Sequence, residues 1–365
     1  MPTWQVGTAC LTFLNRIQMK IIKKKIALVL SILLVVTIAP FFSIGIRGQN
    51  NQSENLEENA LYVIADHTVV EMYNAIPLHW IDKVKHMLLC IPGESHGTAY
   101  LYGLELVEQQ QKRFAVRGTW TGAIEAPMNK YLRVARSYRD INGRWNRSCG
   151  EEDFWTWQDA IDMMDSFLYV MNENLDNRVH AFGFAWCWDM TASVNTNLNG
   201  WAGTLYYGDF DKQNAMKLIH WGLDADDSLI CIDDYIETVE HYNRSNPDTI
   251  TFFTTGPVDG YDGRRGYQRF LKHEYIRQYV KNAQERKYLF DYADILSHND
   301  AGEQNTYSQF ARRVPIIHPD NWGPDGRGYN GGHGYSHINE TGCIRLGKAM
   351  WWMLARMARW DGVSE

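Results

Sequence analysis

The chain is sparing in cysteine and proline, and its first segment has no acidic residue at all. Of its 365 residues, 6 are Cys and 10 are Pro, and no two cysteines form a Cys-x-x-Cys pair. This spacing argues against a structural zinc site. All the charges before position 49 are basic, which leaves 30 basic against 43 acidic residues in the rest of the chain. That excess of negative charge argues against a nucleic-acid partner.

What is present is the composition of a globular protein with many aromatic rings. The sequence is 45% hydrophobic and 22% charged, which excludes disordered, collagen-like and coiled-coil classes. It contains 14 Trp, 20 Tyr and 14 Phe. We expect many of these rings to line a surface or a cleft.

The first segment is typical of an export signal. Four lysines between positions 20 and 25 precede an apolar run over residues 26–46, and a polar linker over 49–59 follows. At about 21 residues the run is also long enough to span a bilayer. Residues 1–48 are therefore predicted to be a signal peptide or an uncleaved anchor, with Met19 as an alternative start. The protein is expected to be secreted, with a membrane association only through such an anchor.

Export places the folded part in an oxidising compartment. Five cysteines lie there and could form at most two disulfides, with the pairing left open: Cys90, Cys149, Cys187, Cys231 and Cys343.

Residues 60–365 contain no linker or repeat and are predicted to form one domain. Strands are expected at 86–91, 114–116, 179–185, 249–255 and 288–290. Helices are expected at 98–112, 151–175, 233–243, 273–285 and 343–359. This alternation predicts an α/β fold, a three-layer α/β/α sandwich with a central parallel sheet. In such sheets ligands bind beyond the carboxyl ends of the strands.

Two short motifs lie near opposite ends of this domain. The strand at 86–91 runs into Pro92-Gly93-Glu94-Ser95-His96-Gly97, where a serine has a nearby helix N-terminus to supply an oxyanion donor. Alone, a serine at such a turn is more often a helix N-cap. The second motif, His337-Ile338-Asn339-Glu340-Thr341-Gly342, precedes the last expected helix, and a histidine there can fold back over the serine.

These motifs resemble the first and last blocks of the SGNH/GDSL hydrolase superfamily, which is flavodoxin-like in fold. Four further segments resemble its secreted bacterial-type members: 183–191, 254–259, 289–294 and 350–360. The resemblance implies a serine ester hydrolase that acts through an acyl-enzyme without metal or cofactor. Ser95 would be the nucleophile and His337 the base.

The sequence departs from the family at the acid and at the oxyanion donors. The family places Asp three residues before its His, but Gly334 stands there, so Asp320, Asp325 or a backbone carbonyl must orient the ring, and we favour Asp320. The oxyanion candidates are the Ser95 N–H, Gly118, Gly122 and Trp188, the last replacing the family's Asn. Either glycine equally fits a plain turn, and Trp188 equally fits a core or sugar-stacking ring.

The substrate is expected to be a small-molecule or polysaccharide ester. Trp120, Trp186 and Trp201 are candidate sugar-binding rings, and no amphipathic lid suggests a lipid. The main alternative is a non-catalytic carbohydrate-binding or surface protein on a degenerate scaffold. A metal-dependent hydrolase is disfavoured because glycines around His333 and His337 oppose the helix that an HxxxH site needs.

Overall fold

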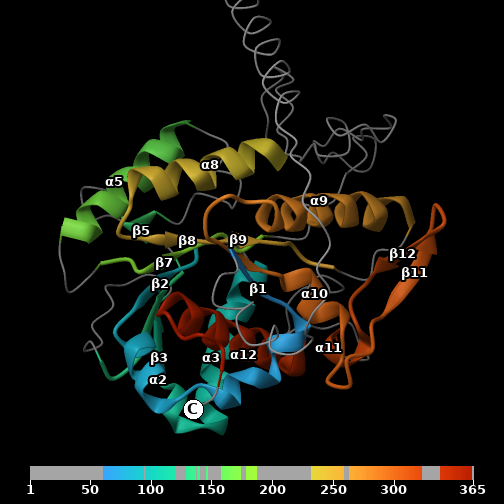
Figure 1. The fold of residues 1–365 in the computed structure, drawn as a ribbon, viewed down its shortest axis with the longest axis horizontal. Helices are drawn as coiled ribbons and strands as arrows, with labels where there is room; N and C mark the ends of the chain where they lie inside the picture. The colour runs from blue at the N-terminus through green and yellow to red at the C-terminus, as the bar shows by residue number, and fades with distance from the viewer. Residues whose placement is uncertain are drawn as a thin grey trace, which may run out of the picture. The chain divides into compact units, whose positions relative to one another are not determined.

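Short, buried parallel strands form the centre of the computed structural model (Figure 1). The structure describes residues 61–93, 95–119, 129–136, 138–139, 145–146, 158–173, 178–186, 232–258, 263–322 and 338–363. All of them belong to one unit, Asn55–Glu365.

Two groups of strands make up the parallel sheet. One has the order β3-β4-β2-β7-β8 and the other has the order β1-β10-β9. Their bounds are β1 Tyr62–Ala65, β2 Leu88–Cys90, β3 Val116–Thr119, β4 Leu132–Ala135, β7 Ala181–Phe182, β8 Ile250–Thr251, β9 Phe253–Thr254 and β10 Lys287–Phe290.

Strands β8 and β9 join the two groups into one sheet, because only Phe252 separates them. The Phe252 N–H donates to the Phe182 carbonyl on one side, and the Thr255 N–H donates to the Phe290 carbonyl on the other. The continuous order is therefore β3-β4-β2-β7-β8/β9-β10-β1, and every pairing is parallel.

Helices cover both faces of this sheet, as Figure 1 shows. Leu89 of β2 belongs to the core formed with α2, α3 and α12, whereas its neighbours Leu88 and Cys90 belong to the core formed with α5, α8 and α9. Strand side chains alternate between faces, so both faces are apolar. The bounds are α2 Leu78–Lys85, α3 Thr98–Gln110, α5 Gln158–Glu173, α8 Ile232–Ser245, α9 Gly263–Lys281 and α12 Glu340–Met357. The predicted three-layer α/β/α fold is confirmed.

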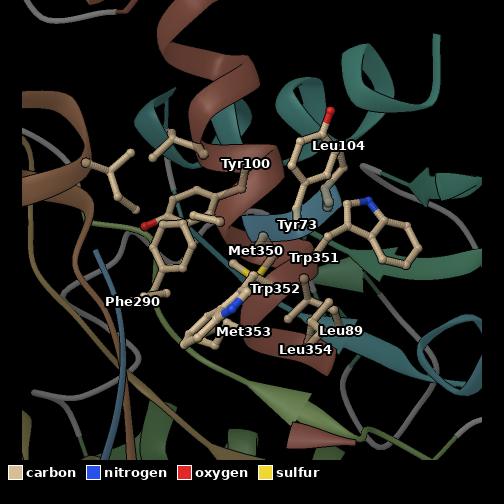
Figure 2. Packing of buried hydrophobic residues seen from close by; sticks show 14 of the residues in the cluster. Tyr73, Leu89, Tyr100, Leu104, Phe290, Met350, Trp351, Trp352, Met353 and Leu354 are labelled. Atoms are coloured by element: carbon tan, nitrogen blue, oxygen red, sulfur yellow. The ribbon is translucent and has the colours of Figure 1, made fainter. Parts of the chain in front are cut away.

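Helices α3 and α12 pack backbone to backbone. A side chain at Gly103 would overlap the Cys343 carbonyl, and one at Gly347 would overlap the Gly103 backbone. Beside this contact, Trp351 packs on Phe114 with ring centroids 5.1 Å apart. Figure 2 shows Trp351, Trp352 and the neighbouring Met and Leu side chains of α12 in this core.

Shorter elements complete the described part of the chain. They are the 3-10 turns η1 His67–Val69, η2 Glu71–Ala75, η3 Ser95–Gly97 and η4 Lys112–Phe114, the helices α10 Tyr292–Ser297 and α11 Pro319–Trp322, and the strands β5 Tyr138–Arg139, β6 Trp145–Asn146, β11 Thr306–Gln309 and β12 Arg312–Pro315. Strands β5 and β6, and β11 and β12, form antiparallel pairs.

The expected strand at 114–116 is displaced. The chain makes turn η4 up to Phe114, and the strand β3 runs from Val116 to Thr119. The serine-bearing strand β2 is not the first in the chain either, since β1 precedes it and lies at the far edge of the sheet.

Two of the five cysteines are free and buried, Cys90 in β2 and Cys343 in α12. The predicted maximum of two disulfides in the folded part therefore falls to one, among Cys149, Cys187 and Cys231. Burial raises the pKa of the Cys343 thiol to about 12, so this thiol is inert at neutral pH. The predicted targeting segment lies outside the described residues, and within them no helix is long and apolar enough to cross a membrane.

Candidate functional site

The Ser95 turn leaves the carboxyl end of β2 through a glycine that no other residue can easily replace. Gly93 has φ +151° and forms a parallel bridge with Ala185, whose carbonyl oxygen a Cβ at Gly93 would overlap. The Ala185 N–H donates to the Pro92 carbonyl at 3.0 Å. Gly93 thus ties the turn to the end of the neighbouring strand β7.

The Ser95 backbone begins turn η3, which leads directly into α3. The first amides of a helix have no carbonyl partner within the helix and carry the positive end of its dipole. Ser95 therefore stands where a strand ends and a helix begins; its side chain lies outside the described atoms.

Arg136 directly follows β4, the strand next to β2, and its guanidinium touches both sides of this turn. Its Nη2 donates to the Gly93 carbonyl at 2.7 Å. Its Nη1 lies so close to Gly97 that a Cβ there would overlap it. Arg136 is only 4% exposed. Nothing in the local sequence pattern around Arg136 indicates this position.

The structure explains two residues of the second motif, Asn339 and Gly342. The Asn339 side chain caps α12 by accepting from the Gly342 N–H at 3.0 Å. A Cβ at Gly342 would lie 2.8 Å from the Asn321 carbonyl oxygen, which explains the glycine. The same Asn321 carbonyl accepts from the Asn339 N–H at 2.9 Å. The motif's histidine, His337, lies outside the described residues.

Asn321 anchors the start of α12 to the carboxyl edge of the sheet. It is fully buried, and its Nδ2 donates to the carbonyls of Leu296 and His298 at 2.8 Å each. Both acceptors belong to the segment that follows β10. The start of α12 is thereby fixed on the same edge of the sheet as the Ser95 turn.

The predicted acid, Asp320, lies beside this anchor. Its carbonyl accepts from the Asn339 Nδ2 at 2.9 Å, two residues from His337. Its carboxylate is 62% exposed and lies 3.5 Å from the His318 Nδ1. His318 is thus in reach of the Asp320 carboxylate.

Gly118 lies inside β3, which β4 separates from β2. A side chain at Gly118 would overlap Leu101 of α3, so close packing of the helix explains this glycine. Trp186 follows the Gly93–Ala185 bridge and is 2% exposed. Its indole N–H donates to the Thr254 carbonyl at 3.0 Å, and its ring packs edge-on against Tyr235. Both residues are therefore placed in packing environments.

The remaining predicted residues lie outside the described part of the chain. They are Trp120, Gly122, Trp188, Trp201 and His337, together with the alternative acid Asp325.

A second polar cluster, also missed from the sequence, lies at the ends of β1 and β10. His67 Nδ1 lies 2.5 Å from the Asp294 carboxylate, and the His67 backbone N–H donates to the same oxygen at 2.9 Å. His298 Nδ1 lies 2.8 Å from the Asp294 carbonyl. The two imidazoles stack with centroids 3.5 Å apart and planes 10° apart. His67 and His298 are 231 positions apart in the sequence, so no local pattern indicates that they form a pair.

The parallel stacking of the two imidazoles limits which ligands the cluster can bind. An imidazole binds a metal along an in-plane lone pair, and two parallel planes cannot both aim at one ion. The arrangement fits a shared proton better than a shared metal. The hydrogen bond to Asp294 raises the pKa of His67, whereas burial lowers the pKa of His298. Burial raises the pKa of Asp66 beside them, as do the charges of Asp294 and Asp291.

This cluster is separate from the Ser95 turn. Four strand spacings lie between β2 and β1, which corresponds to about 19 Å across the sheet. A groove of about 640 Å³ lies at the opposite, amino end of the strands, because Lys287 at the start of β10 lines it together with Tyr279 and Asn282. The Ser95 turn therefore remains the best candidate active site among the described residues.

A scan of the chain against protein-family models found no match, and a search of curated proteins found none. Any assignment of function therefore depends on the two motifs and on the geometry that surrounds them.

Proposed function

We propose that the chain is an exported serine ester hydrolase that acts through an acyl-enzyme on acyl esters of carbohydrates. The observation that carries the proposal is the common position of the two motifs. The Ser95 turn and the Asn339 cap of α12 both lie at the carboxyl edge of one parallel sheet, on helices that pack against each other.

The order of the strands supports this position for a ligand. From β2 the chain passes to β3 and β4 on one side, and then crosses to β7 on the other. In open α/β sheets, ligands bind in the crevice outside the carboxyl ends of such a pair of strands. Gly93 and Ala185 are the two residues that meet there.

In the proposed reaction, His337 accepts the Ser95 hydroxyl proton while Oγ attacks the ester carbonyl carbon. The carbonyl oxygen becomes negatively charged, and amides at the start of η3 and α3 stabilise it. The bond to the alcohol then breaks, and His337 protonates the departing oxygen. His337 then accepts a proton from water, whose oxygen attacks the acyl carbon. The bond to Ser95 Oγ breaks, His337 returns the proton to Oγ, and the acid is released.

Asp320 is the proposed orienting carboxylate. The Asp320 backbone carbonyl accepts from the Asn339 Nδ2, and Asn339 follows His337 by two residues in the sequence. We further propose sugar esters as the substrate class, because Trp120 and Trp201 are sequence candidates for rings that stack on a sugar. We propose export because of the basic and apolar order of residues 20–46.

The first prediction tests this proposal by kinetics on p-nitrophenyl acetate and an acetylated polysaccharide. Ser95→Ala is expected to abolish turnover of both, because nucleophile and base act as a unit worth many orders of magnitude. Asp320→Asn is expected to lower kcat by about a hundredfold or more. Asp82→Asn on the exposed face of α2 serves as the control and should leave kcat unchanged.

Unchanged turnover in folded Ser95→Ala would refute the proposal. Polysaccharide binding without any turnover in the wild type would instead favour the non-catalytic carbohydrate-binding alternative. A loss below about threefold in Asp320→Asn would assign the orienting role to Asp325 or to a carbonyl.

A further inference from the structure

Arg136 is a charged side chain buried beneath the candidate active site. Burying a guanidinium costs several kcal/mol unless hydrogen bonds compensate the lost hydration. The side chain is 4% exposed, and one of its donors is given to the Gly93 carbonyl at 2.7 Å. Buried charges in such positions are functional-site candidates.

The guanidinium contacts the Ser95 turn at two points on either side of the serine. Gly93 is two residues before Ser95 and accepts a hydrogen bond, and Gly97 is two residues after it and has no side chain where Nη1 lies. Glycine at position 97 is thus explained by the arginine together with Ala185, because a side chain there would overlap both the guanidinium and the Ala185 Cβ. Two nitrogens of one planar guanidinium make these contacts, one as a hydrogen bond and one by close approach, and the single ammonium of lysine cannot reproduce both.

The Arg136 charge affects groups in both elements that flank the turn, β2 and α3. Burial raises the pKa of Cys90 in β2 and of Tyr100 in α3, and the Arg136 charge opposes both shifts. The guanidinium therefore lies between the end of β2 and the start of α3. The backbone that carries Arg136 is also fixed, because the carbonyl of the preceding residue, Ala135, accepts from the Ile91 N–H at 2.9 Å.

We propose that Arg136 is the positioning residue of the nucleophile turn, and that its guanidinium holds Gly93 and Gly97 so that Ser95 and the first amides of α3 keep a fixed geometry. This inference depends on the proposed function for its catalytic meaning. The structural role of Arg136 in holding the turn does not depend on the proposed function. The experiment below tests the structural role and the catalytic role separately.

The test compares Arg136→Met and Arg136→Lys with the wild type. Arg117→Met is the matched control, because Arg117 lies on neighbouring β3 with a half-exposed side chain. Amide hydrogen exchange of the peptide 91–99 is expected to rise by about tenfold or more in both Arg136 variants, but not in β10. Labelling of Ser95 by a serine-directed phosphonate is expected to slow by about a hundredfold, since small displacements of reacting groups have effects of that size.

Lysine keeps the charge but not both contacts, so its labelling rate is expected to stay near that of Arg136→Met. Recovery of both rate and exchange in Arg136→Lys would overturn the positioning role in favour of a plain charge effect. Unchanged exchange over 91–99 in either folded variant would overturn it outright. If wild-type Ser95 is not labelled at all, the proposed hydrolase function fails, and the exchange data alone then support or overturn the holding of the turn.

Discussion

At the scale of single residues, the candidate site depends on glycines that permit close approach. Gly93 adopts φ +151° against the Ala185 backbone, and Gly97 leaves room for the Arg136 guanidinium. These two contacts fix the turn from the end of β7 on one side and from the end of β4 on the other. The Gly-Glu-Ser motif thus has a packing reason in addition to any chemical one.

Gly97→Ala tests the second contact. The added methyl would overlap the guanidinium, so we expect a loss of about 1–3 kcal/mol in unfolding free energy, the usual effect of overpacking. Thermal and urea unfolding would measure it. Combining Gly97→Ala with Arg136→Met should recover part of the loss, and strict additivity of the two losses would contradict the contact.

The stacked histidines predict how stability depends on pH. Folding raises the pKa of His67, so its contribution is complete below the ordinary value of 6.5 and is lost as pH rises through the folded pKa. Folding lowers the pKa of His298, so stability falls as pH drops from 6.5 through that lower value. Burial raises the pKa of Asp294, but its bonds to His67 outweigh this and leave it lowered. Arg345 on α12 opposes the protonation of both histidines.

The cluster is therefore expected to stabilise the fold most near pH 6.5, when His67 is charged and His298 is neutral. His67→Phe should remove the loss on the alkaline side, and His298→Phe should reduce the loss on the acid side. Urea unfolding between pH 5 and 8.5 would measure both, with His86→Gln on an exposed position as the control. Curves that run parallel for all four proteins would contradict the shared-proton interpretation.

At the scale of elements, the start of α12 is the part of the site that the structure explains best. Asn339 caps the helix, and Asn321 holds it against the segment after β10. Asn339→Ala is expected to cost about 1 kcal/mol, whereas Asn339→Ser keeps the cap and should cost less. Thermal unfolding compares them, and equal losses would show that the Nδ2 bond to Asp320 matters more than the cap.

The elements also show what a sequence pattern can and cannot reveal. The expected helices at 98–112 and 343–359 match α3 and α12, because their apolar residues recur at helical spacing. Helix α9 begins at Gly263, ten residues before the prediction at 273. Its first half contains Arg269 and Lys272, which are charged and yet buried, so hydrophobic periodicity does not mark it. Burial and the neighbouring Arg269 lower the pKa of Lys272 to about 7.

The sequence pattern predicts some of the short strands and not others. β2 and β10 were predicted from continuous apolar runs, whereas β1 and β4 were not predicted. β4 contains Arg133, which is 2% exposed, so its sequence looks polar where the strand is buried. Without β4 in the expected fold, the sequence does not place Arg136 beside the Ser95 turn.

At the scale of the whole described unit, the sequence predicts the layers but not the order of the strands. Alternating strands and helices indicate a parallel sheet, and that prediction is confirmed. The order β3-β4-β2-β7-β8/β9-β10-β1 depends on contacts between residues far apart in the chain. The His67–Asp294 pair, 227 positions apart, is such a contact, and no local pattern announces it.

The packing of α3 on α12 is the contact that joins the two motif-bearing helices. A methyl group at Gly103 would overlap the Cys343 carbonyl, so Gly103→Ala is expected to cost about 3 kcal/mol and to lower ester turnover. Gln109→Ala on the exposed end of α3 is the control, with an expected change within about 0.5 kcal/mol. A wild-type unfolding midpoint for Gly103→Ala would contradict the described helix contact.

The most direct test of the proposed hydrolase is to locate a covalent adduct. Wild-type protein, Ser95→Ala and His337→Gln are incubated with a serine-directed phosphonate, and each is analysed by intact mass and peptide mapping. The account predicts one added phosphonate on the peptide that contains Ser95 in the wild type, none in Ser95→Ala, and a much slower reaction in His337→Gln. A wild-type protein that stays unlabelled, or an adduct on any other residue, would contradict it.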